Sequence, residues 1–179
     1  EVDRQMFPAD LRSSESFDLF MGLILKRLAD NGRAVVVLPD GFMFGDGVKA
    51  TIKEKLMREC NLHTVIRLPQ SVFAPYTSIT TNLLFFDKTG STSETWFYRF
   101  DMPEGYKHFS KTKPMLPKHL EVVDEWWDNR VDLVDDEGYD KAKCYSYDEI
   151  KANGFDLNLC GYPAKTVEVL SPEDTMKEY

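Results

Sequence analysis

The chain has 179 residues and a mass of 20.7 kDa, the size of one ordinary domain or of one domain with an appendage. Hydrophobic residues make up 42% and charged residues 29%, which is enough for a packed core and excludes wholesale disorder. Lysine and arginine total 22 against 30 acidic residues, a formal net charge of −8. A compact module that binds DNA phosphates normally has a basic excess, so any nucleic-acid contact must be local to one face or shared with a partner.

Membrane and export signals are missing from the sequence pattern. The longest apolar runs, such as residues 34–38, are far shorter than the roughly 20 residues that span a bilayer. The first ten residues show neither the basic nor the apolar region of a signal peptide, and the chain begins without Met, which indicates an excised piece of a longer protein. We therefore expect no membrane association.

Three scattered cysteines favour a reducing cytoplasm over a disulfide framework: Cys60, Cys144 and Cys160. Cys60 and His63 have C-x-x-H spacing, but no second pair of ligands with zinc-site spacing accompanies them. We therefore expect no metal site, and interpret both residues as part of a helix end and the strand that follows it.

The first predicted elements are a helix over residues 13–31 and a strand over 33–38. An apolar stripe with a period of 3.6 residues runs along the helix, with Ser13 or Ser14 as its N-cap and Gly32 just after its end. The strand is a continuous β-branched run. Because it is apolar on both faces, it predicts burial on both sides, as in a parallel sheet covered by helices.

A second helix over about 48–60 and a strand over 61–68 complete a strand–helix–strand unit, which normally makes a right-handed parallel crossover. Two further strands are predicted over 79–87 and 95–101. Gly90 lies between them and suggests a turn, so this pair could form a hairpin.

The character of the chain changes after residue 102. Prolines, the lysines around them and an acidic stretch over 132–140 indicate a loop-rich extension, in which the acidic stretch is a solvated loop. Short helices are expected near 117–129 and 147–153. In the first of these helices, Trp126 and Trp127 are better explained as an anchor onto the domain or a partner than as part of a ligand site.

Two loops follow the first two strands, and both begin with Leu-Pro. If the strands are parallel, both loops lie at the carboxyl edge of the sheet, where open α/β sheets bind ligands. The loops carry four aromatic residues that could stack on a base or pack beneath their own loops: Phe42, Phe44, Phe73 and Tyr76.

The residues from Gly45 to Ala50 match G-x-G-x-x-A, a dinucleotide-binding pattern. The first glycine of that pattern should follow its strand directly, whereas about six residues separate Leu38 from Gly45. No acidic residue ends a strand about 20 positions further on. A loop that leads into a helix is therefore the preferred interpretation.

The order of these segments resembles a known family. The runs NGRAVVVLPDGFMF and LHTVIRLPQSVFAPYTSITTNLLFFDK, with the later ETWFYRFD and VVDEWWDNR, are similar to the later half of the catalytic domain in the methylation (M) subunit of type I restriction-modification systems. The run YSYDEIKANGFDLNLCGYP resembles the segment that follows that domain. Such subunits are adenine-N6 DNA methyltransferases that use S-adenosylmethionine.

The resemblance implies an α/β fold: part of a Rossmann-like class I methyltransferase sheet with a loop-rich, partly helical extension. Residues 1–101 would be the C-terminal half of the methyltransferase domain, with 1–12 as the tail of a preceding loop, and 102–179 the extension. The strand over 79–87 would insert antiparallel between the strands over 33–38 and 61–68. A specificity subunit, a restriction subunit and DNA are the implied partners.

The family's glycine-rich cofactor loop and its Asn-Pro-Pro-aromatic catalytic tetrapeptide are both missing from the chain. The resemblance therefore implies no catalytic residue, no main S-adenosylmethionine site and no activity of this chain alone. Val72-Phe73 matches the position of a loop aromatic that stacks on the flipped adenine, so Phe73 is the base-stacking candidate. Pro39, Asp40, Gly41 and Phe42 are candidates for lining the same pocket.

Two non-enzymatic alternatives stay open at this stage. One is a ligand-binding α/β module that uses the residues from Gly45 to Ala50 to hold a nucleotide. The other is a non-catalytic assembly module that contacts a partner through the extension.

Overall fold

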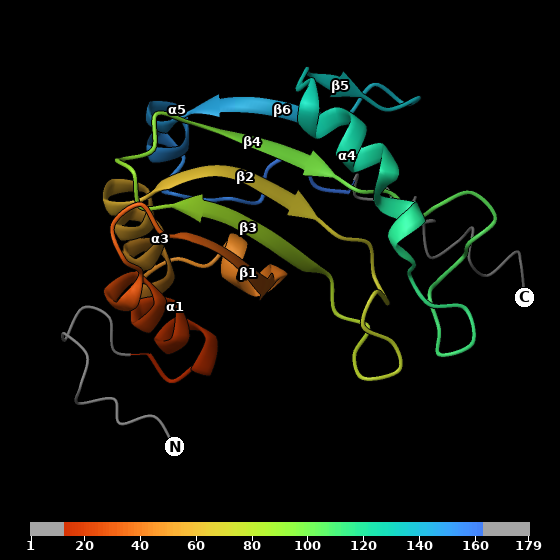
Figure 1. The fold of residues 1–179 in the computed structure, drawn as a ribbon, viewed down its shortest axis with the longest axis horizontal. Coiled ribbons are helices and arrows are strands. Elements are labelled where there is room, and N and C mark those ends of the chain that lie inside the picture. Colours follow the sequence, from red (N-terminus) through yellow and green to blue (C-terminus); the bar gives the residue numbers. More distant parts are fainter. Residues whose placement is uncertain (1–12, 163–179) are drawn as a thin grey trace, which may run out of the picture.

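The computed structural model describes residues 13–162, which form a six-stranded sheet with helices on both faces (Figure 1). The strand order is β1-β3-β2-β4-β6-β5, and the β2–β4 pair is the parallel one among these neighbours. The strands are β1 (Arg33–Pro39), β2 (Asn61–Arg67), β3 (Thr81–Asp87), β4 (Glu94–Arg99), β5 (Leu133–Val134) and β6 (Asp140–Ser146). The predicted α/β class is confirmed.

Strand β3 lies between β1 and β2 and is antiparallel to both, as the resemblance implied. Leu84 of β3 pairs with Val36 of β1 on one side and with Val65 of β2 on the other. Strands β1 and β2 therefore run in the same direction, and β4 is parallel to β2. The carboxyl ends of these three strands meet at one edge of the sheet, on the right in Figure 1.

The predicted hairpin between β3 and β4 is wrong, because β4 pairs with β2 and β6 instead. Both edges of β3 are already occupied by β1 and β2. Thr92 fixes the connection: its N–H donates to Met57 O, and its hydroxyl donates to Cys60 O and accepts from Leu62 N–H. These bonds hold the chain at the start of β2, so the next strand adds beside β2.

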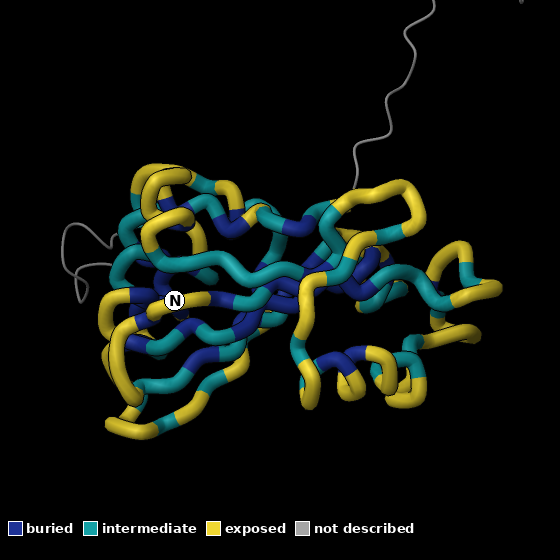
Figure 2. The backbone as a smooth tube through the Cα atoms, turned by 90° about the horizontal axis from the view of Figure 1, so that it is seen from above, coloured by how far each residue is buried: buried dark blue, intermediate teal, exposed yellow. Residues whose placement is uncertain are grey.

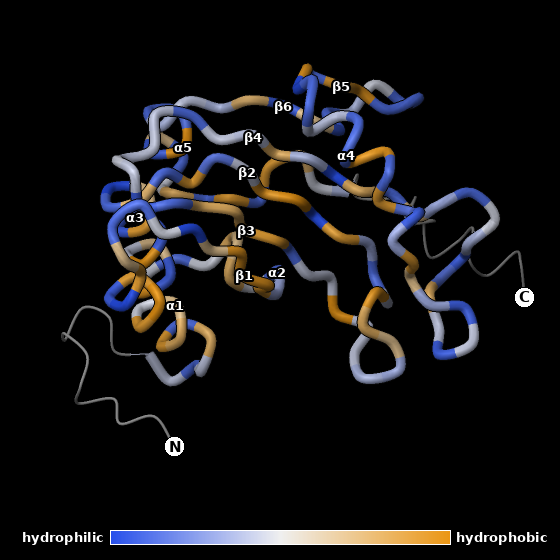
Figure 3. Tube along the Cα trace, viewed as in Figure 1, coloured by the Kyte–Doolittle hydropathy of each residue, from blue (hydrophilic) through white to orange (hydrophobic). Residues whose placement is uncertain are grey.

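The helices divide between the two faces of the sheet. On one face α1 (Ser16–Arg27), α2 (Asp40–Met43), α3 (Val48–Glu59) and α5 (Tyr147–Ala152) cover an apolar core. Its buried members include Met21, Phe42, Ile52, Leu56, Leu84, Phe86 and Phe97. On the other face η3 (Pro117–Leu120) and α4 (Glu121–Asp128) cover a smaller core that includes Ile66, Tyr98, Val123 and Trp126. Figure 2 shows buried residues gathered in the middle of the fold and exposed residues on its outer loops, and Figure 3 shows apolar stretches on the strands and on the helices that cover them.

Helix α1 is shorter than the predicted 13–31 at both ends. Its N-cap is Glu15, without a side-chain cap bond, and Ser13 instead accepts the Glu15 N–H and donates to Asp18. The helix ends at Arg27, well before Gly32. Gly32 is needed for another reason: a Cβ at this position would lie 2.7 Å from the carbonyl oxygen of Ala29.

Burial of β1 on both faces is also wrong. Val35 and Val37 are 53% and 46% exposed, whereas Ala34 and Val36 pack on the larger core. Strand β1 is at the edge of the sheet formed by the described residues, and the Trp-bearing helix α4 covers the same face only over other strands. The β-branched run therefore predicts a strand here correctly but does not predict that both faces of the strand are buried.

The segment after residue 102 contributes more regular structure than predicted. Its short helices are confirmed as η3–α4 and α5, but β5 and β6 were missed, and β5 lies inside the predicted acidic loop. Strand β6 pairs with β4 and so joins the same sheet. The boundary at residue 102 stays a prediction, and the expected loop tail at 1–12 lies outside the described residues. No helix in residues 13–162 is long and apolar enough to cross a membrane.

Candidate functional site at the carboxyl ends of β1, β2 and β4

Asp40 links the ends of three strands. It follows β1 directly. One of its carboxylate oxygens accepts a hydrogen bond of 2.5 Å from Nη2 of Arg67, at the end of β2. The other accepts a hydrogen bond of 2.8 Å from Nδ2 of Asn82, in β3. Asn82 is 1% exposed, and the Arg67 side chain is 11% exposed. The bridge from Asp40 N–H to Thr80 O adds a backbone tie of 3.1 Å. The loop after β1 is thereby held against the end of β2.

Two arginines lie side by side at this edge. Arg67 of β2 and Arg99 of β4 are register partners in the parallel pair, and both are buried. Two adjacent buried guanidinium groups repel each other unless carboxylates neutralise them. Asp40 serves Arg67, whose Nη1 also donates to Asn158, while Arg67 Nε is buried without a partner among the described residues.

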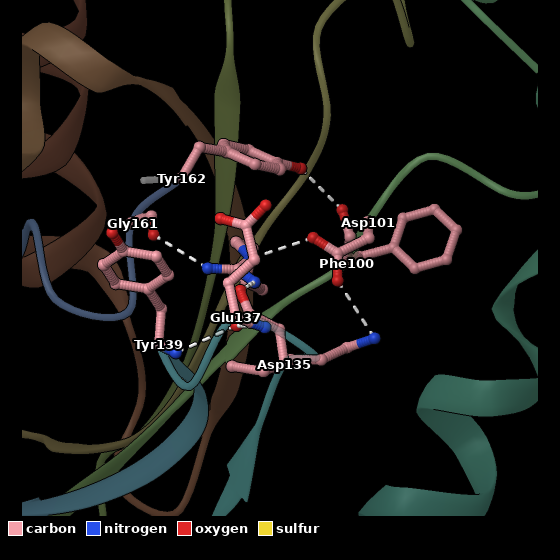
Figure 4. Close-up of polar contacts among 9 residues, drawn as sticks. Phe100, Asp101, Asp135, Glu137, Tyr139, Gly161 and Tyr162 are labelled. Atoms are coloured by element: carbon pink, nitrogen blue, oxygen red, sulfur yellow. Dashed lines mark hydrogen bonds and ion pairs between the residues drawn. The ribbon is translucent and has the colours of Figure 1, made fainter. Parts of the chain in front are cut away.

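Arg99 is neutralised by two carboxylates from different segments, Asp101 and Asp135, which are labelled in Figure 4. Its Nε donates to Asp101 at 2.8 Å, and its Nη2 donates to Asp135 at 2.5 Å. Burial opposes the charge, but these hydrogen bonds raise the pKa of Arg99. Desolvation likewise opposes ionisation of Asp135, but Arg99 and the N–H groups of Tyr139 and Glu137 lower the pKa of its carboxyl.

Tyr162 closes the group from the C-terminal side. Its hydroxyl donates to Phe100 O at 2.6 Å, and its ring centroid lies 6.0 Å from the Arg67 guanidinium and 5.6 Å from that of Arg99. Burial raises the pKa of the Tyr162 phenol, so it stays protonated as a donor. Arg99 Nη1 also donates to Gly161 O at 3.0 Å (Figure 4), which fixes this segment over the strand ends.

A cavity of about 870 Å³ opens beside this group. Its walls come from the loop after β2 and from the loop after β4, and Tyr162 also lines it. Phe109 of the second loop is 1% exposed, and its N–H donates to Ser71 Oγ of the first loop at 2.8 Å. The two loops are therefore joined at one point and form a preshaped hollow within the size range of small-molecule sites.

The structure separates the four predicted loop aromatics. Phe73, the base-stacking candidate, is 39% exposed and lies between Ser71 and Ala74, both of which line the cavity. Tyr76 and Phe44 are 93% and 57% exposed. Phe42 is fully buried in the core, with its ring 6.4 Å from Phe17, so its selection as a pocket-lining residue is wrong: α2 turns it inward.

The other pocket-lining candidates lie where predicted at the end of β1, although they do not line the cavity. Pro39 pairs with Thr81 of β3, and Gly41 has no neighbouring atom within 4 Å of where a Cβ would be. Asp40 is the one that makes the polar contacts described above. A role for these residues in a binding pocket stays a prediction.

Side chains of this protein already contact the segment from Gly45 to Ala50, which matches the glycine pattern. Lys53 is fully buried on α3, and its Nζ donates to Met43 O at 2.7 Å and Gly45 O at 2.9 Å. Burial lowers the pKa of Lys53 to about 8. Lys49, in the first turn of α3, pairs with Glu15 and Asp18 at 2.7 and 3.4 Å. Carboxylates at this helix N-terminus would repel a pyrophosphate, so the geometry favours a loop that leads into a helix.

The tryptophan pair anchors α4 on the sheet. Trp126 packs against Trp96 and Tyr98 with ring centroids 5.8 and 4.7 Å apart, and Trp127 packs against Phe85 at 4.9 Å. His63, the partner of Cys60 in the C-x-x-H spacing, contacts Trp127 at 6.0 Å. Cys60 is buried in the opposite core, so the two residues belong to different faces.

Sequence reasoning missed most of the polar residues at this edge. They are Arg67, Asn82, Arg99, Asp135, Asn158 and Tyr162. A signal was present: both VIRLP and FYRFD place an arginine inside an apolar strand end. A charged residue in such a run is buried only with partners. The partners lie up to 91 residues away in sequence, and spacing cannot reveal them.

Comparison with known proteins identifies the family of the chain. The family model of N-6 DNA methylases matches residues 5–169. The chain belongs to this family. It is 45% identical over 175 residues, 97% of its length, to the EcoEI type I restriction enzyme methylase subunit of Escherichia coli, and 35% identical over 111 residues, 57% of its length, to the EcoKI subunit of strain K12. It covers 36% and 20% of those two proteins.

Solved structures agree. A type I modification subunit from Vibrio vulnificus YJ016 superimposes on 94% of the chain with a TM-score of 0.77 and 40% identity. A chain from a structure of type I restriction-modification complex assembly matches over 98% with a TM-score of 0.78 and 33% identity. The chain covers 36% and 37% of these, so this member of the N-6 DNA methylase family spans about a third of the length of its relatives.

Proposed function

We propose that the chain is part of a type I methylation subunit, which in its whole form transfers a methyl group from S-adenosylmethionine to adenine N6 in DNA. The observation that carries this proposal is the 45% identity to a type I methylase subunit along 97% of the chain. The chain contributes the last strands of the sheet and the loops at their ends. It carries no Asn-Pro-Pro-aromatic tetrapeptide, and we expect no methyl transfer by the chain alone.

Phe73 is proposed to stack on the adenine. N6 chemistry requires the base to leave the duplex and to be held in a pocket with its amine in line with the methyl group. Phe73 is half-exposed on a loop whose neighbouring residues line the large cavity. Asp40, held by Arg67 and Asn82, is proposed as a positioning residue that fixes the loop after β1 at the same edge.

The described residues do not fit S-adenosylmethionine itself. Gly45 O of the glycine loop before α3 already accepts from the buried Lys53, and the loop stands about six residues after the end of β1 and not directly after it, as a cofactor loop requires. No other glycine-rich strand–helix turn occurs in residues 13–162. We assign cofactor binding to the rest of the longer protein.

The proposed partners are DNA, a specificity subunit and a restriction subunit. Support comes from the match to a chain in a type I complex assembly structure. The net charge of −8 suits a subunit that shares DNA contact with a partner instead of wrapping DNA alone. All three cysteines are free, as suits a reducing cytoplasm.

The test is methyl transfer from radiolabelled S-adenosylmethionine to DNA by the whole methylation subunit assembled with its specificity subunit. We expect activity in the assembly and none with the 179-residue chain alone. Phe73→Ala should lower the rate about 5- to 150-fold, since base–aromatic stacking contributes about 1–3 kcal/mol, and Phe73→Trp should retain most of it. Tyr76→Ala is the matched control, because Tyr76 is an exposed aromatic of the same loop. Equal rates for the Phe73→Ala and Tyr76→Ala assemblies would exclude the stacking role.

A further inference from the structure

The loop after β4 concentrates positive charge in an acidic chain. Within this loop, residues 105–116 contain three lysines and one histidine and no aspartate or glutamate; Asp101 and Glu104 stand earlier in the same loop, and the whole chain has a net charge of −8. Three of these side chains line the 870 Å³ cavity: Lys107, His108 and Lys111. All three are exposed. This is the local basic face that an acidic protein requires if it is to contact a polyanion.

The two cavity-lining lysines are not committed elsewhere among the described residues. Ion pairs in residues 13–162 involve other lysines, including Lys49, Lys55 and Lys141, and neither Lys107 nor Lys111 takes part in one. Lys113 differs from both. Its Nζ donates to Gly105 O at 3.0 Å and lies 4.0 Å from the Tyr106 ring centroid, so it braces the loop.

The loop is built as a rigid platform. Ser110 and Lys113 exchange backbone hydrogen bonds of 3.0 and 3.1 Å, which closes a tight turn. The Phe109 side chain is buried, with its ring 5.5 Å from Tyr106 and 5.9 Å from His119. Its N–H is bonded to Ser71 Oγ of the facing loop. Lys107, His108 and Lys111 are thereby presented at fixed positions on either side of an anchored residue.

The opposite wall of the cavity is of a different kind. It is uncharged, with the polar side chains of Gln70, Ser78 and Thr80 on its lining. Within the same loop stands the exposed aromatic Phe73. Cations on one wall and an aromatic side chain beside the other are the combination that binds single-stranded nucleic acid, through its phosphates and its unstacked bases respectively.

We propose that Lys107 and Lys111 hold the phosphates of a DNA strand whose unpaired base lies at Phe73. The inference rests on the proposed function for the identity of that strand, and it adds the element that holds its backbone. An extruded base needs its flanking phosphates fixed, because a strand free to move would carry the base out of the pocket. The loop after β4 supplies that fixation from within this chain.

The experiment is fluorescence anisotropy of a short labelled single-stranded DNA oligonucleotide titrated with the whole 179-residue chain. The double variant Lys107→Gln/Lys111→Gln is compared with Lys26→Gln/Arg27→Gln, which removes the same charge from the exposed end of α1. For single-stranded DNA, each phosphate contact contributes about −0.7 to the slope of log affinity against log salt concentration. With two such contacts, a fourfold rise in salt concentration should lower the affinity about sevenfold. We expect the loop variant to lose this sevenfold dependence and the α1 variant to keep it.

An oligonucleotide with an abasic site separates the two walls. Phe73→Ala should weaken binding of the intact oligonucleotide and have no effect on the abasic one, whereas the lysine substitutions should weaken both. Equal effects of the loop and α1 variants, or a wild-type chain that does not bind at low salt, would overturn the proposal. Equally tight binding of a polyglutamate peptide would assign the loop to an acidic protein partner and overturn it as well.

Failure of this inference is distinguishable from failure of the proposed function. Lysine-dependent oligonucleotide binding without methyl transfer by the whole assembly would remove the methylation role and leave the loop as a nucleic-acid contact. Methyl transfer with unchanged affinity in the loop variant would leave the methylation role and remove the loop assignment.

Discussion

Substitution of Asp40 tests whether the polar group at the strand ends holds this edge together. Asp40→Ala removes the ion pair to Arg67 and the acceptor of the buried Asn82 amide in one step. Removing one partner of a fully buried ion pair costs about 3–5 kcal/mol, and an unsatisfied buried donor costs about 1–3 kcal/mol.

Solvent reduces these values, because the Asp40 and Arg67 side chains are 25% and 11% exposed. Arg67 also keeps its hydrogen bond to Asn158. We therefore expect Asp40→Ala to lower the free energy of unfolding by about 2–3 kcal/mol. Asp40→Asn keeps the shape and one acceptor oxygen but loses the ion pair, and its NH₂ group would face either Arg67 or the Asn82 amide as a second donor, so we expect a loss of about 2 kcal/mol as well.

The measurement is equilibrium unfolding in urea followed by tryptophan fluorescence. Trp126 and Trp127 report the packing of α4 on the sheet and lie outside the Asp40 contacts. Glu59→Ala is the control, since it breaks the exposed Lys55–Glu59 pair at 2.9 Å, which contributes about 0.5 kcal/mol or less. A double-mutant cycle with Arg67→Met should give a coupling energy of about 1–3 kcal/mol. If Asp40→Ala costs no more than Glu59→Ala, the edge is not held by this group and the reasoning fails.

Three further predictions concern separate parts of the fold. Trp126→Ala should lower the free energy of unfolding by about 3–5 kcal/mol in the same urea assay, because it empties the core under α4, and a loss below about 1 kcal/mol would refute that packing role. Ser146→Ala should cost about 1 kcal/mol, since Ser146 caps α5 in a reciprocal capping box with Glu149; an unchanged urea midpoint would contradict it. Burial lowers the pKa of Lys53 to about 8 from an ordinary value of 10.5, so the folded protein loses this proton at a lower pH than the unfolded protein. Between pH 8 and 10.5 the free energy of unfolding of the wild type should therefore rise by about 2–3 kcal/mol relative to that of Lys53→Met. A pH-independent difference between the two proteins would refute this assignment.

The sequence by itself determined the order and type of most elements. Hydrophobic periodicity located α1 and α3, and β-branched or aromatic runs located β1 to β4, because these patterns are local consequences of which face meets the core. The resemblance of the strand and loop motifs identified the family before any contact was known. Phe73 was placed on an exposed loop beside the strand ends from its motif alone.

Only the tertiary structure decided how those elements meet. The hydrogen bonds of Thr92 direct the chain to the side of β2 that is opposite β3, and no turn residue in the sequence predicts this path. Phe42 and Phe73 lie in two segments that both begin with Leu-Pro. Phe42 is buried because it lies on α2, whereas Phe73 is 39% exposed. Arg67 finds its partners 27 and 91 residues away along the chain. Local propensity acts over a few residues, whereas strand pairing and charge neutralisation join segments that only folding brings together, so this part of the site could not be read from spacing.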